Sequence, residues 1–215
     1  MKWNDIYLKF GSVQIRPLKI IVDFNKMLPK NKKLNILDLG CGTGRHTKYF
    51  GKNKNFEMFA FDSSEKALEI LKKEYVGTNL NIIKGFFDKL PFKNNFFDVI
   101  ISTKTLHHGS LVEIQKFISE ITRVLKPRGF LLIVILSDKD FRVKTGEKYK
   151  GEINTRINCD NLPDADIPHH FFSNEEINTC FSDYVVVEKR DINRVAMNGL
   201  KKSSYYDLIL KKTKK

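Results

Sequence analysis

The stretch that most constrains the fold is NILDLGCGTGRHTKYF, which occupies residues 35–50. Residues 35–39 form an apolar run of strand type with one acid, Asp38, near its end. Residues 40–44 contain three glycines and predict a tight loop, and a helix is expected to begin near Arg45. In α/β proteins a buried strand, a glycine-rich loop and a helix form a cradle for nucleotide-like ligands. The stretch therefore predicts a ligand site at the end of a buried strand.

Apolar, strand-forming segments alternate with helical patterns along the chain, as expected for parallel strands joined by right-handed crossovers. Residues 65–75 and 111–125 both repeat apolar side chains at helical spacing, and Pro127 follows the second of them as a stop signal. The last two strand candidates lie about fourteen residues apart without a helical pattern between them, so they should pair antiparallel. The pattern predicts a doubly wound, mostly parallel α/β sheet with strands at 34–39, 57–61, 80–84, 97–102, 129–136, 184–189 and 204–211.

Length and composition fit one globular domain over residues 1–215. The chain is 41% hydrophobic and 12% aromatic, which is enough to bury a core and too apolar for a disordered chain. Within it, residues 137–172 form a polar insert without a clear period, and long inserts in compact domains are commonly functional. We expect this insert to act as a lid over the substrate.

The cysteines and the apolar runs indicate the compartment. Cys41, Cys159 and Cys180 have no short pair spacing, which argues against a disulfide framework and against a zinc–cysteine site. The longest apolar run, residues 130–136, is too short to cross a bilayer, and the opening MKWNDIYLKF lacks the apolar core of a signal sequence. We therefore expect a cytoplasmic protein without membrane contact.

The formal net charge of +13 is concentrated at the two ends of the chain. Residues 1–35 carry +6 and residues 201–215 carry +5, which leaves +2 for residues 36–200. The basic ends could hold the phosphates of an RNA. They could equally be solvated lysines on a nearly neutral body, and this interpretation is favoured because lysine is abundant throughout the chain.

The glycine spacing and Asp38 distinguish two kinds of nucleotide-like ligand. A dinucleotide fingerprint requires G-x-G-x-x-G, whereas this loop reads G-x-G-x-G and has Arg45 in place of the third glycine. A pyrophosphate beside Asp38 would be repelled by about 4 kcal/mol, for unit charges about 4 Å apart at an effective dielectric of about 20. S-Adenosylmethionine instead carries a sulfonium and an ammonium group, which Asp38 attracts. Asp62, at the end of the second strand, would bind ribose hydroxyls or cap the next helix together with the serines that follow it.

Five segments resemble the successive motifs of a known family. They are ILDLGCGTGRHTKYF, FAFDSS, LPFKNNFFDVIIS, LHH and EITRVLKPRGFLLIV, and they occur in the expected order over residues 34–136. They resemble class I S-adenosylmethionine-dependent methyltransferases of the type-11-like branch. The resemblance implies a seven-stranded Rossmann-like sheet with the final strand inserted antiparallel, S-adenosylmethionine as the cofactor, and methyl transfer as the activity.

Two motifs depart from the family pattern. Family members often read Gly-Asp-Ala-Glu before LPF, and the first acid contacts the adenine amine, but this chain has Phe86 at that position. Asp88 or a backbone amide near Phe87 could serve the adenine instead, or the two phenylalanines pack in the core and Asp88 is solvated. The family's Lys-Pro-Gly-Gly reads Lys-Pro-Arg-Gly here, and Gly129 is expected to supply the positive φ of that turn. The candidate cofactor residues are Asp38, Gly40, Cys41, Gly42, Gly44, Asp62, Ser63, Phe87 and Asp88.

Two histidine pairs are candidates for the chemistry. Methyl transfer is an in-line displacement that depends mainly on alignment, with a general base needed only if the nucleophile arrives protonated. His107 lies shortly after the fourth strand and His169 lies shortly before a helix. Because histidine titrates near neutral pH, both are candidate catalytic or substrate-lining residues. The alternative is that the first pair closes a turn and the second packs at the start of a helix. Because adjacent histidines rarely share one ion, no metal site is expected.

Three functions remain open at this point. The first is a methyltransferase that acts on a small-molecule methyl acceptor, favoured by the nearly neutral body and by the insert. The second is a tRNA methyltransferase of the wobble-nucleoside type that uses the basic ends to hold RNA, which would make binding strongly salt-dependent. The third is a non-catalytic, cofactor-binding subunit that keeps the fold.

Overall fold

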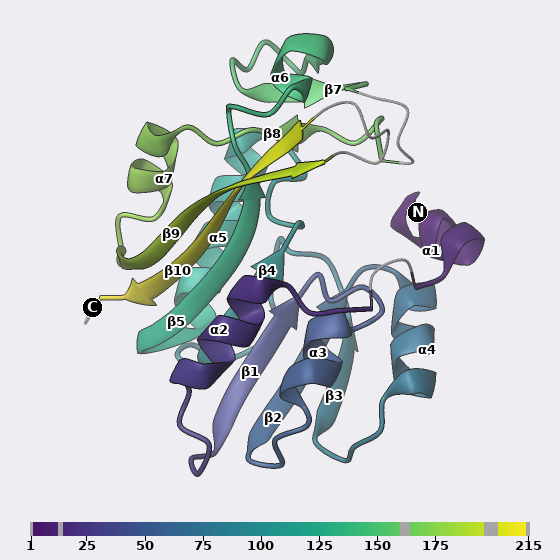
Figure 1. Cartoon of the computed structure of the whole chain (residues 1–215), viewed down its shortest axis with the longest axis vertical. Coiled ribbons are helices and arrows are strands. Elements are labelled where there is room, and N and C mark those ends of the chain that lie inside the picture. The colour runs from purple at the N-terminus through teal and green to yellow at the C-terminus, as the bar shows by residue number, and fades with distance from the viewer. Residues whose placement is uncertain (1, 13–14, 160–163, 196–201, 214–215) are drawn as a thin grey trace.

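The structure is a computed structural model that describes residues 2–12, 15–159, 164–195 and 202–213 (Figure 1). Seven strands form one sheet in the order β3-β2-β1-β4-β5-β10-β9. β1 to β5 pair in parallel, and β10 runs antiparallel to both β5 and β9. The predicted doubly wound sheet with an inserted antiparallel final strand is confirmed. The strands are β1 (Leu34–Leu39), β2 (Phe56–Asp62), β3 (Leu80–Lys84), β4 (Phe97–Thr103), β5 (Leu125–Leu136), β9 (Tyr184–Val195) and β10 (Lys202–Lys212).

Helices cover both faces of this sheet, and α2 and α5 each bury an apolar stripe against it (Figure 1). On one face α5 packs through Ile114, Ile118 and Ile121, and on the other α2 packs through Ile21 and Phe24. Within the described ranges, no helix combines the length and the apolar composition needed to cross a bilayer. The helices are α1 (Lys2–Phe10), α2 (Lys19–Met27), α3 (Arg45–Phe50), α4 (Glu65–Glu74), α5 (Leu111–Val124), α6 (Arg142–Thr145) and α7 (Asn174–Cys180).

The direction of the strands defines two edges of the sheet. The carboxyl ends of β1 to β5 lie at one edge, here called the carboxyl edge, and their amino ends lie at the opposite amino edge. In the antiparallel register of β10 with β5, Tyr205 pairs with Leu136 and Lys211 pairs with Phe130. β10 therefore begins at the carboxyl edge and ends at the amino edge.

The insert after β5 has its own secondary structure. It contains α6 and a three-stranded sheet of β6 (Glu147–Lys148), β7 (Thr155–Ile157) and β8 (His169–His170), beyond the carboxyl edge at the top of Figure 1. The Phe172 N–H donates to the Leu136 carbonyl at 2.9 Å, which ties the end of the insert to its beginning. Sequence periodicity does not predict these strands because each has only two or three residues.

The turn that leads into the buried part of β5 corrects one expectation. Arg128, and not Gly129, has the positive φ, at 64°. A Cβ atom at position 129 would lie 2.8 Å from Cδ1 of Leu125 and 2.9 Å from the Lys126 carbonyl oxygen. Glycine is therefore required at position 129 because neighbouring atoms leave no room for a Cβ atom. The left-handed backbone conformation is adopted by Arg128, at the position where the family has the first glycine of Lys-Pro-Gly-Gly.

Candidate cofactor and acceptor site

Asp38 lies at the carboxyl end of β1, with only 1% of its surface exposed. Its Oδ2 atom accepts hydrogen bonds from the Thr47 backbone N–H at 2.9 Å and from the Thr47 hydroxyl at 2.6 Å. Thr47 belongs to the first turn of α3, whose N–H groups have no partner within the helix, so Asp38 joins the strand to the helix. Burial raises the pKa of Asp38 to about 6, although the Thr47 hydrogen bonds act in the opposite direction.

Asp62 ends β2 and is also buried. Its Oδ2 atom accepts from the Gly42 N–H and its Oδ1 atom accepts from the Ser64 N–H, each at 2.8 Å. The N-cap of α4 is Ser64, whose side chain accepts from the Ala67 N–H, and not Asp62, which the sequence offered as the cap. Burial raises the pKa of Asp62, against the effect of these backbone hydrogen bonds. An ionised carboxylate has about four lone-pair positions, so Asp62 can organise the loop and still accept from a ligand.

Gly40, Gly42 and Gly44 all have positive φ, at 72°, 53° and 76°. Residues with a side chain rarely adopt this backbone conformation. A Cβ at Gly40 would lie 2.3 Å from Cγ2 of Thr105, and a Cβ at Gly42 would lie 2.4 Å from the Tyr7 hydroxyl oxygen. The loop therefore needs glycine both for its backbone and for its close contact with α1 and with the segment after β4.

The charges around this loop fit a cationic ligand. Asp38 and Asp62 are both buried, and the charge of Asp62 adds to the rise in the pKa of Asp38. A cation bound beside them would offset both the burial and the mutual repulsion of the two carboxylates. The sulfonium and ammonium groups of S-adenosylmethionine meet this requirement, whereas a pyrophosphate would add a third negative group. The residues present therefore fit S-adenosylmethionine.

The remaining predicted cofactor residues occupy different environments. Cys41 is buried within the loop, and burial raises the pKa of its thiol. Ser63 is half-buried next to Asp62. Phe87 is half-buried and packs against two other phenylalanine rings, at centroid distances of 6.0 and 5.6 Å. Asp88 is exposed and makes no hydrogen bond or ion pair with another described residue. A role of Phe87 or Asp88 at the adenine stays a prediction.

The two histidine pairs meet at the carboxyl edge although about sixty residues separate them in the sequence. An antiparallel bridge pairs His108 with His169, and the His170 N–H donates to the His107 carbonyl at 2.8 Å. The rings of His108 and His169 lie 4.9 Å apart between centroids. The insert is therefore joined by its backbone to the segment that follows β4.

His107 and His169, the two candidates from the sequence, are both buried. Burial lowers the pKa of His107 well below its ordinary value, so its ring is neutral at pH 7. The Nδ1 atom of His107 has no hydrogen-bond partner among the described residues. A buried neutral ring can accept a proton only from a group that reaches it, and the roles of both residues in catalysis stay predictions. The side chain of His108 is more exposed than that of His169. His108 was not one of the two candidates chosen from the sequence.

Two further residues of the site were missed. Thr105 contacts Gly40, and its carbonyl oxygen accepts from the His108 N–H at 3.1 Å, so it joins the glycine loop to the histidines. Its position just after a parallel strand was the available signal. The Asp164 carboxylate lies beside the Nε2 atoms of His108 and His169. No local pattern marks Asp164, because its approach to His108 depends on the fold of the insert.

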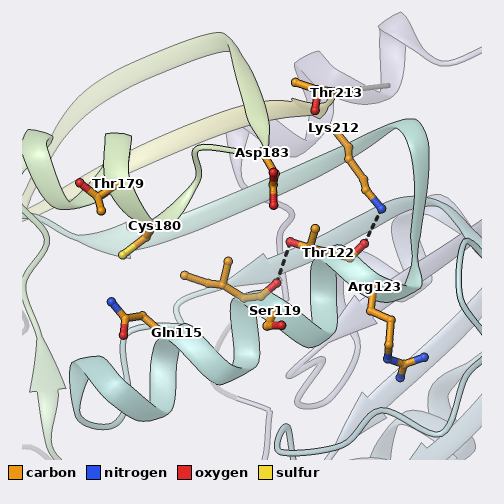
Figure 2. Close-up of a pocket in the computed structure, with 10 residues that line it drawn as sticks. Gln115, Ser119, Thr122, Arg123, Thr179, Cys180, Asp183, Lys212 and Thr213 are labelled. Carbon is orange, nitrogen blue, oxygen red and sulfur yellow. Dashed lines mark hydrogen bonds between the residues drawn. The ribbon is translucent and has the colours of Figure 1, made fainter. Parts of the chain in front are cut away.

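A separate pocket of about 540 Å³ lies between α5, α7 and the end of β10 (Figure 2). Its lining includes Gln115, Thr122, Cys180 and Lys212, and none of the predicted cofactor residues. The Lys212 ammonium donates to the Thr122 and Leu125 carbonyl oxygens at 2.6 and 2.8 Å, so its charge caps the end of α5. Because β10 ends at the amino edge, this pocket is not part of the cofactor site.

Comparisons with known proteins agree with the geometry. Residues 37–133 match the family model of the methyltransferase domain. A ubiquinone/menaquinone biosynthesis C-methyltransferase from Wigglesworthia glossinidia brevipalpis is 39% identical over 140 residues, which is 62% of this chain and 53% of that protein. A tRNA (carboxymethyluridine(34)-5-O)-methyltransferase from Mus musculus is 26% identical over 176 residues, which is 80% of this chain. The chain spans only 25% of that mouse protein.

A solved structure with the same fold is an S-adenosylmethionine-dependent methyltransferase from Methanosarcina mazei. It has a TM-score of 0.73 and 18% sequence identity, and the match covers 93% of this chain and 100% of that one. The family model covers the same residues that carry the glycine loop, Asp38, Asp62 and the segment after β4. Residues 37–133 therefore match a methyltransferase domain, and the chain has the fold of S-adenosylmethionine-dependent methyltransferases.

Proposed function

We propose that this chain transfers a methyl group from S-adenosylmethionine to a small molecule. The observation that carries the proposal is the pair of buried carboxylates, Asp38 and Asp62, on either side of a glycine loop with left-handed backbone. Because glycine has no side chain, a ligand can closely approach the backbone of this loop. The two acids favour a ligand with positive charge. The third possibility, a subunit without activity, has no specific support from the site.

In this proposal the protein acts mainly by binding and alignment. S-Adenosylmethionine, when bound, supplies a methyl group that is already activated on a sulfonium. Asp38 and Asp62 hold the cationic and hydroxyl groups of the ligand, and α1 excludes water from the loop because Tyr7 lies against Gly42. Since alignment of the two reactants accounts for much of the rate, no general base is required for an acceptor that arrives with a free lone pair.

The positions of the basic residues support a small acceptor over RNA. Lys30, Lys32 and Lys33 directly precede β1, and therefore lie near the amino edge. Lys211 and Lys212 end β10, which also finishes at the amino edge. These five of the fourteen basic residues in the two ends are thus on the side of the sheet opposite the cofactor loop. The insert, our proposed substrate lid, is joined by backbone hydrogen bonds to the segment after β4.

The compartment is also part of the proposal. The three cysteines all lie in the described residues and none is in a disulfide. This state suits a reducing compartment, and we propose that the protein works in the cytoplasm.

The test is a labelling assay with S-adenosylmethionine that carries an isotopic methyl group and an extract of the source cells. The products are separated by size with and without ribonuclease, and the Asp62→Ala variant serves as the control for cofactor-dependent labelling. We expect label in a small, ribonuclease-insensitive fraction, in which mass spectrometry can identify the acceptor. Label in a large, ribonuclease-sensitive fraction would instead support the tRNA activity named for the mouse relative, and no label at all would contradict methyl transfer.

A further inference from the structure

Three side chains with metal-binding atoms converge where the insert meets the segment after β4. Asp164 Oδ2 lies 3.3 Å from His169 Nε2 and 3.8 Å from His108 Nε2. The ligand atoms of all three residues lie within 4.8 Å of one another. Two ligands of a tetrahedral ion with bonds of about 2.0–2.2 Å are about 3.3–3.5 Å apart, so this arrangement needs little movement to close on an ion. We propose that His108, His169 and Asp164 form a binding site for a divalent transition-metal ion, Zn²⁺ in particular.

The tautomers of the two rings are set by the backbone. His108 Nδ1 lies 2.9 Å from the Thr105 carbonyl oxygen, and His169 Nδ1 lies 2.7 Å from the Ile167 carbonyl oxygen. A carbonyl oxygen can only accept, so each Nδ1 carries the hydrogen and each neutral ring presents a lone pair at Nε2. Metal-bound histidines almost always donate their second N–H to a carbonyl or carboxylate in this way.

When both rings are neutral, the three facing atoms have no donor between them, and the 3.3 Å contact of His169 with Asp164 becomes a hydrogen bond only if a ring is protonated. Two Nε2 lone pairs and a carboxylate oxygen point toward one another in a place where His169 is 3% and Asp164 is 23% exposed at the side chain. Acceptors that face one another in a partly dry site repel unless a positive charge lies between them. A metal ion supplies that charge to all three atoms at once, whereas a proton on one ring satisfies only one contact.

The scaffold that holds the ligands is built from backbone hydrogen bonds. The His108–His169 bridge is flanked by the Gly109 N–H donating to the Pro168 carbonyl at 2.8 Å. On the Asp164 side, the Ile167 N–H donates to the Asp164 carbonyl at 2.9 Å and closes a turn. Sites held by such fixed elements keep their geometry without the ion. This proposal replaces the expectation from sequence, which considered adjacent histidines and not one histidine from each pair.

The ligand set selects the class of ion. Two imidazoles with one carboxylate suit Zn²⁺ and its first-row neighbours, whereas Mg²⁺ and Ca²⁺ prefer oxygen ligands alone. Three protein ligands also leave a fourth position open, as in catalytic rather than structural zinc sites. The ion would therefore hold water or one further ligand.

The open position lies beside the cofactor loop. Thr105 contacts Gly40 with its side chain and holds His108 with its carbonyl oxygen. α1 covers both places, because Tyr7 lies against Gly42 and the Trp3 ring meets the His108 ring edge-on at 4.9 Å. If methyl transfer occurs as proposed above, the fourth ligand is an oxygen or nitrogen atom of the methyl acceptor, and this part of the inference rests on that proposed function.

The experiment is a Co²⁺ titration of the tag-free full chain after dialysis against a chelator, followed by visible absorption of the bound ion. We expect one equivalent of Co²⁺ with the intense bands of a four- or five-coordinate site, and displacement of Co²⁺ by Zn²⁺. Asp164→Asn should weaken binding at least tenfold, since a charged ligand is lost. Asp166→Asn is the matched control: it makes the same change at an exposed acid two residues away and should bind like the wild type.

Equal Co²⁺ affinity of Asp164→Asn and Asp166→Asn, or no bands in the wild type at one equivalent, would overturn the metal site. Circular dichroism of each variant shows that it is folded. Azide added to the Co²⁺ form tests the open position and should shift the bands, and unchanged bands would overturn the open coordination position. None of these readings uses S-adenosylmethionine or an acceptor, so failure of the metal site and failure of methyl transfer are separate results.

Discussion

Two neighbouring regions at the carboxyl edge differ in the hydrogen-bonding groups that surround their carboxylates. In the glycine loop, Asp38 and Asp62 accept hydrogen bonds from N–H and O–H groups of the loop and the following helices. At the junction with the insert, Asp164 faces two Nε2 atoms that have lone pairs when the rings are neutral. In the first region the carboxylates already have donors, although their burial still favours a bound cation. The second region has acceptors on all sides and is completed only by a cation.

The largest effect is expected where the two regions touch. Gly40→Ala places a Cβ 2.3 Å from Thr105 Cγ2 and puts a side chain on a backbone with φ of 72°. Left-handed backbone costs about 1–2 kcal/mol and overpacking about 1–3 kcal/mol, so we expect a loss of about 2–5 kcal/mol in the free energy of unfolding. Urea unfolding measures it.

Gly11→Ala is the matched control for this substitution. Gly11 also has a positive φ, 58°, but no atom lies within 4 Å of the Cβ that alanine would add. It should therefore lose only the backbone part, about 1–2 kcal/mol. Equal losses of unfolding free energy in the two variants would mean that the Thr105 side chain moves aside at no cost. The contact between the two regions would then contribute little to stability.

The second prediction uses the pKa of Asp38. Its pKa is raised to about 6 from 3.8 by burial, with Thr47 and Arg45 lowering it and Asp62 raising it. The native state therefore binds a proton more tightly than the unfolded chain, and this contribution to stability is present at low pH and is lost as the pH rises through about 6. A shift of about two units corresponds to about 3 kcal/mol.

Asp38→Asn removes this titration and keeps an oxygen that can accept from Thr47. The stability of the variant relative to the wild type should rise between about pH 4 and pH 6 and then stay level, which urea unfolding at several pH values would measure. The Thr47 hydrogen bonds to the ionised carboxylate are already part of the net pKa shift of Asp38. A difference that is flat with pH would show that Asp38 is not destabilised by burial, and would remove the main argument for a cationic ligand at the loop.

The two regions also differ in how far the sequence predicted them. The glycine loop is local: Asp38, the glycines and Thr47 fall within ten residues, and β1 (Leu34–Leu39) and β3 (Leu80–Lys84) have the bounds that the pattern predicts. The predicted bounds of other strands of this sheet differ from the observed bounds where pairing with a neighbouring strand sets the strand ends. β5 begins at Leu125, before Pro127, and β9 extends to Val195 because β10 pairs with it.

The junction could not be predicted in the same way. His108 and His169 are paired by a bridge between segments about sixty residues apart, and β7 and β8 are too short to give a period. The sequence placed both histidine pairs near the acceptor, from the rule that ligands bind at the carboxyl ends of parallel strands. The backbone hydrogen bonds of the insert determine which histidine of one pair faces which histidine of the other pair. They also bring Asp164 next to the two facing rings.

The smallest predicted effect tests the contrast directly. In metal-free protein, Asp164→Asn replaces an acceptor by an amide that can donate to the lone pair of an Nε2 atom. One added hydrogen bond between neutral groups contributes about 0.5–1.5 kcal/mol, so the variant should be more stable than the wild type by about that amount in urea unfolding. Asp166→Asn should not gain this stability, because Asp166 is exposed and is not one of the three facing residues.

Addition of Zn²⁺ should reverse the order of the two proteins. The ion stabilises only a native state that binds it, by about 2.7 kcal/mol at a free concentration one hundred times the dissociation constant. The wild type should then exceed Asp164→Asn, because the amide is a poorer ligand than the carboxylate. If Asp164→Asn is instead less stable than the wild type by more than about 1 kcal/mol in chelator, a protonated histidine already pairs with Asp164. Asp164 would then already have a donor, as the carboxylates of the glycine loop do, and the contrast between the two regions would not hold.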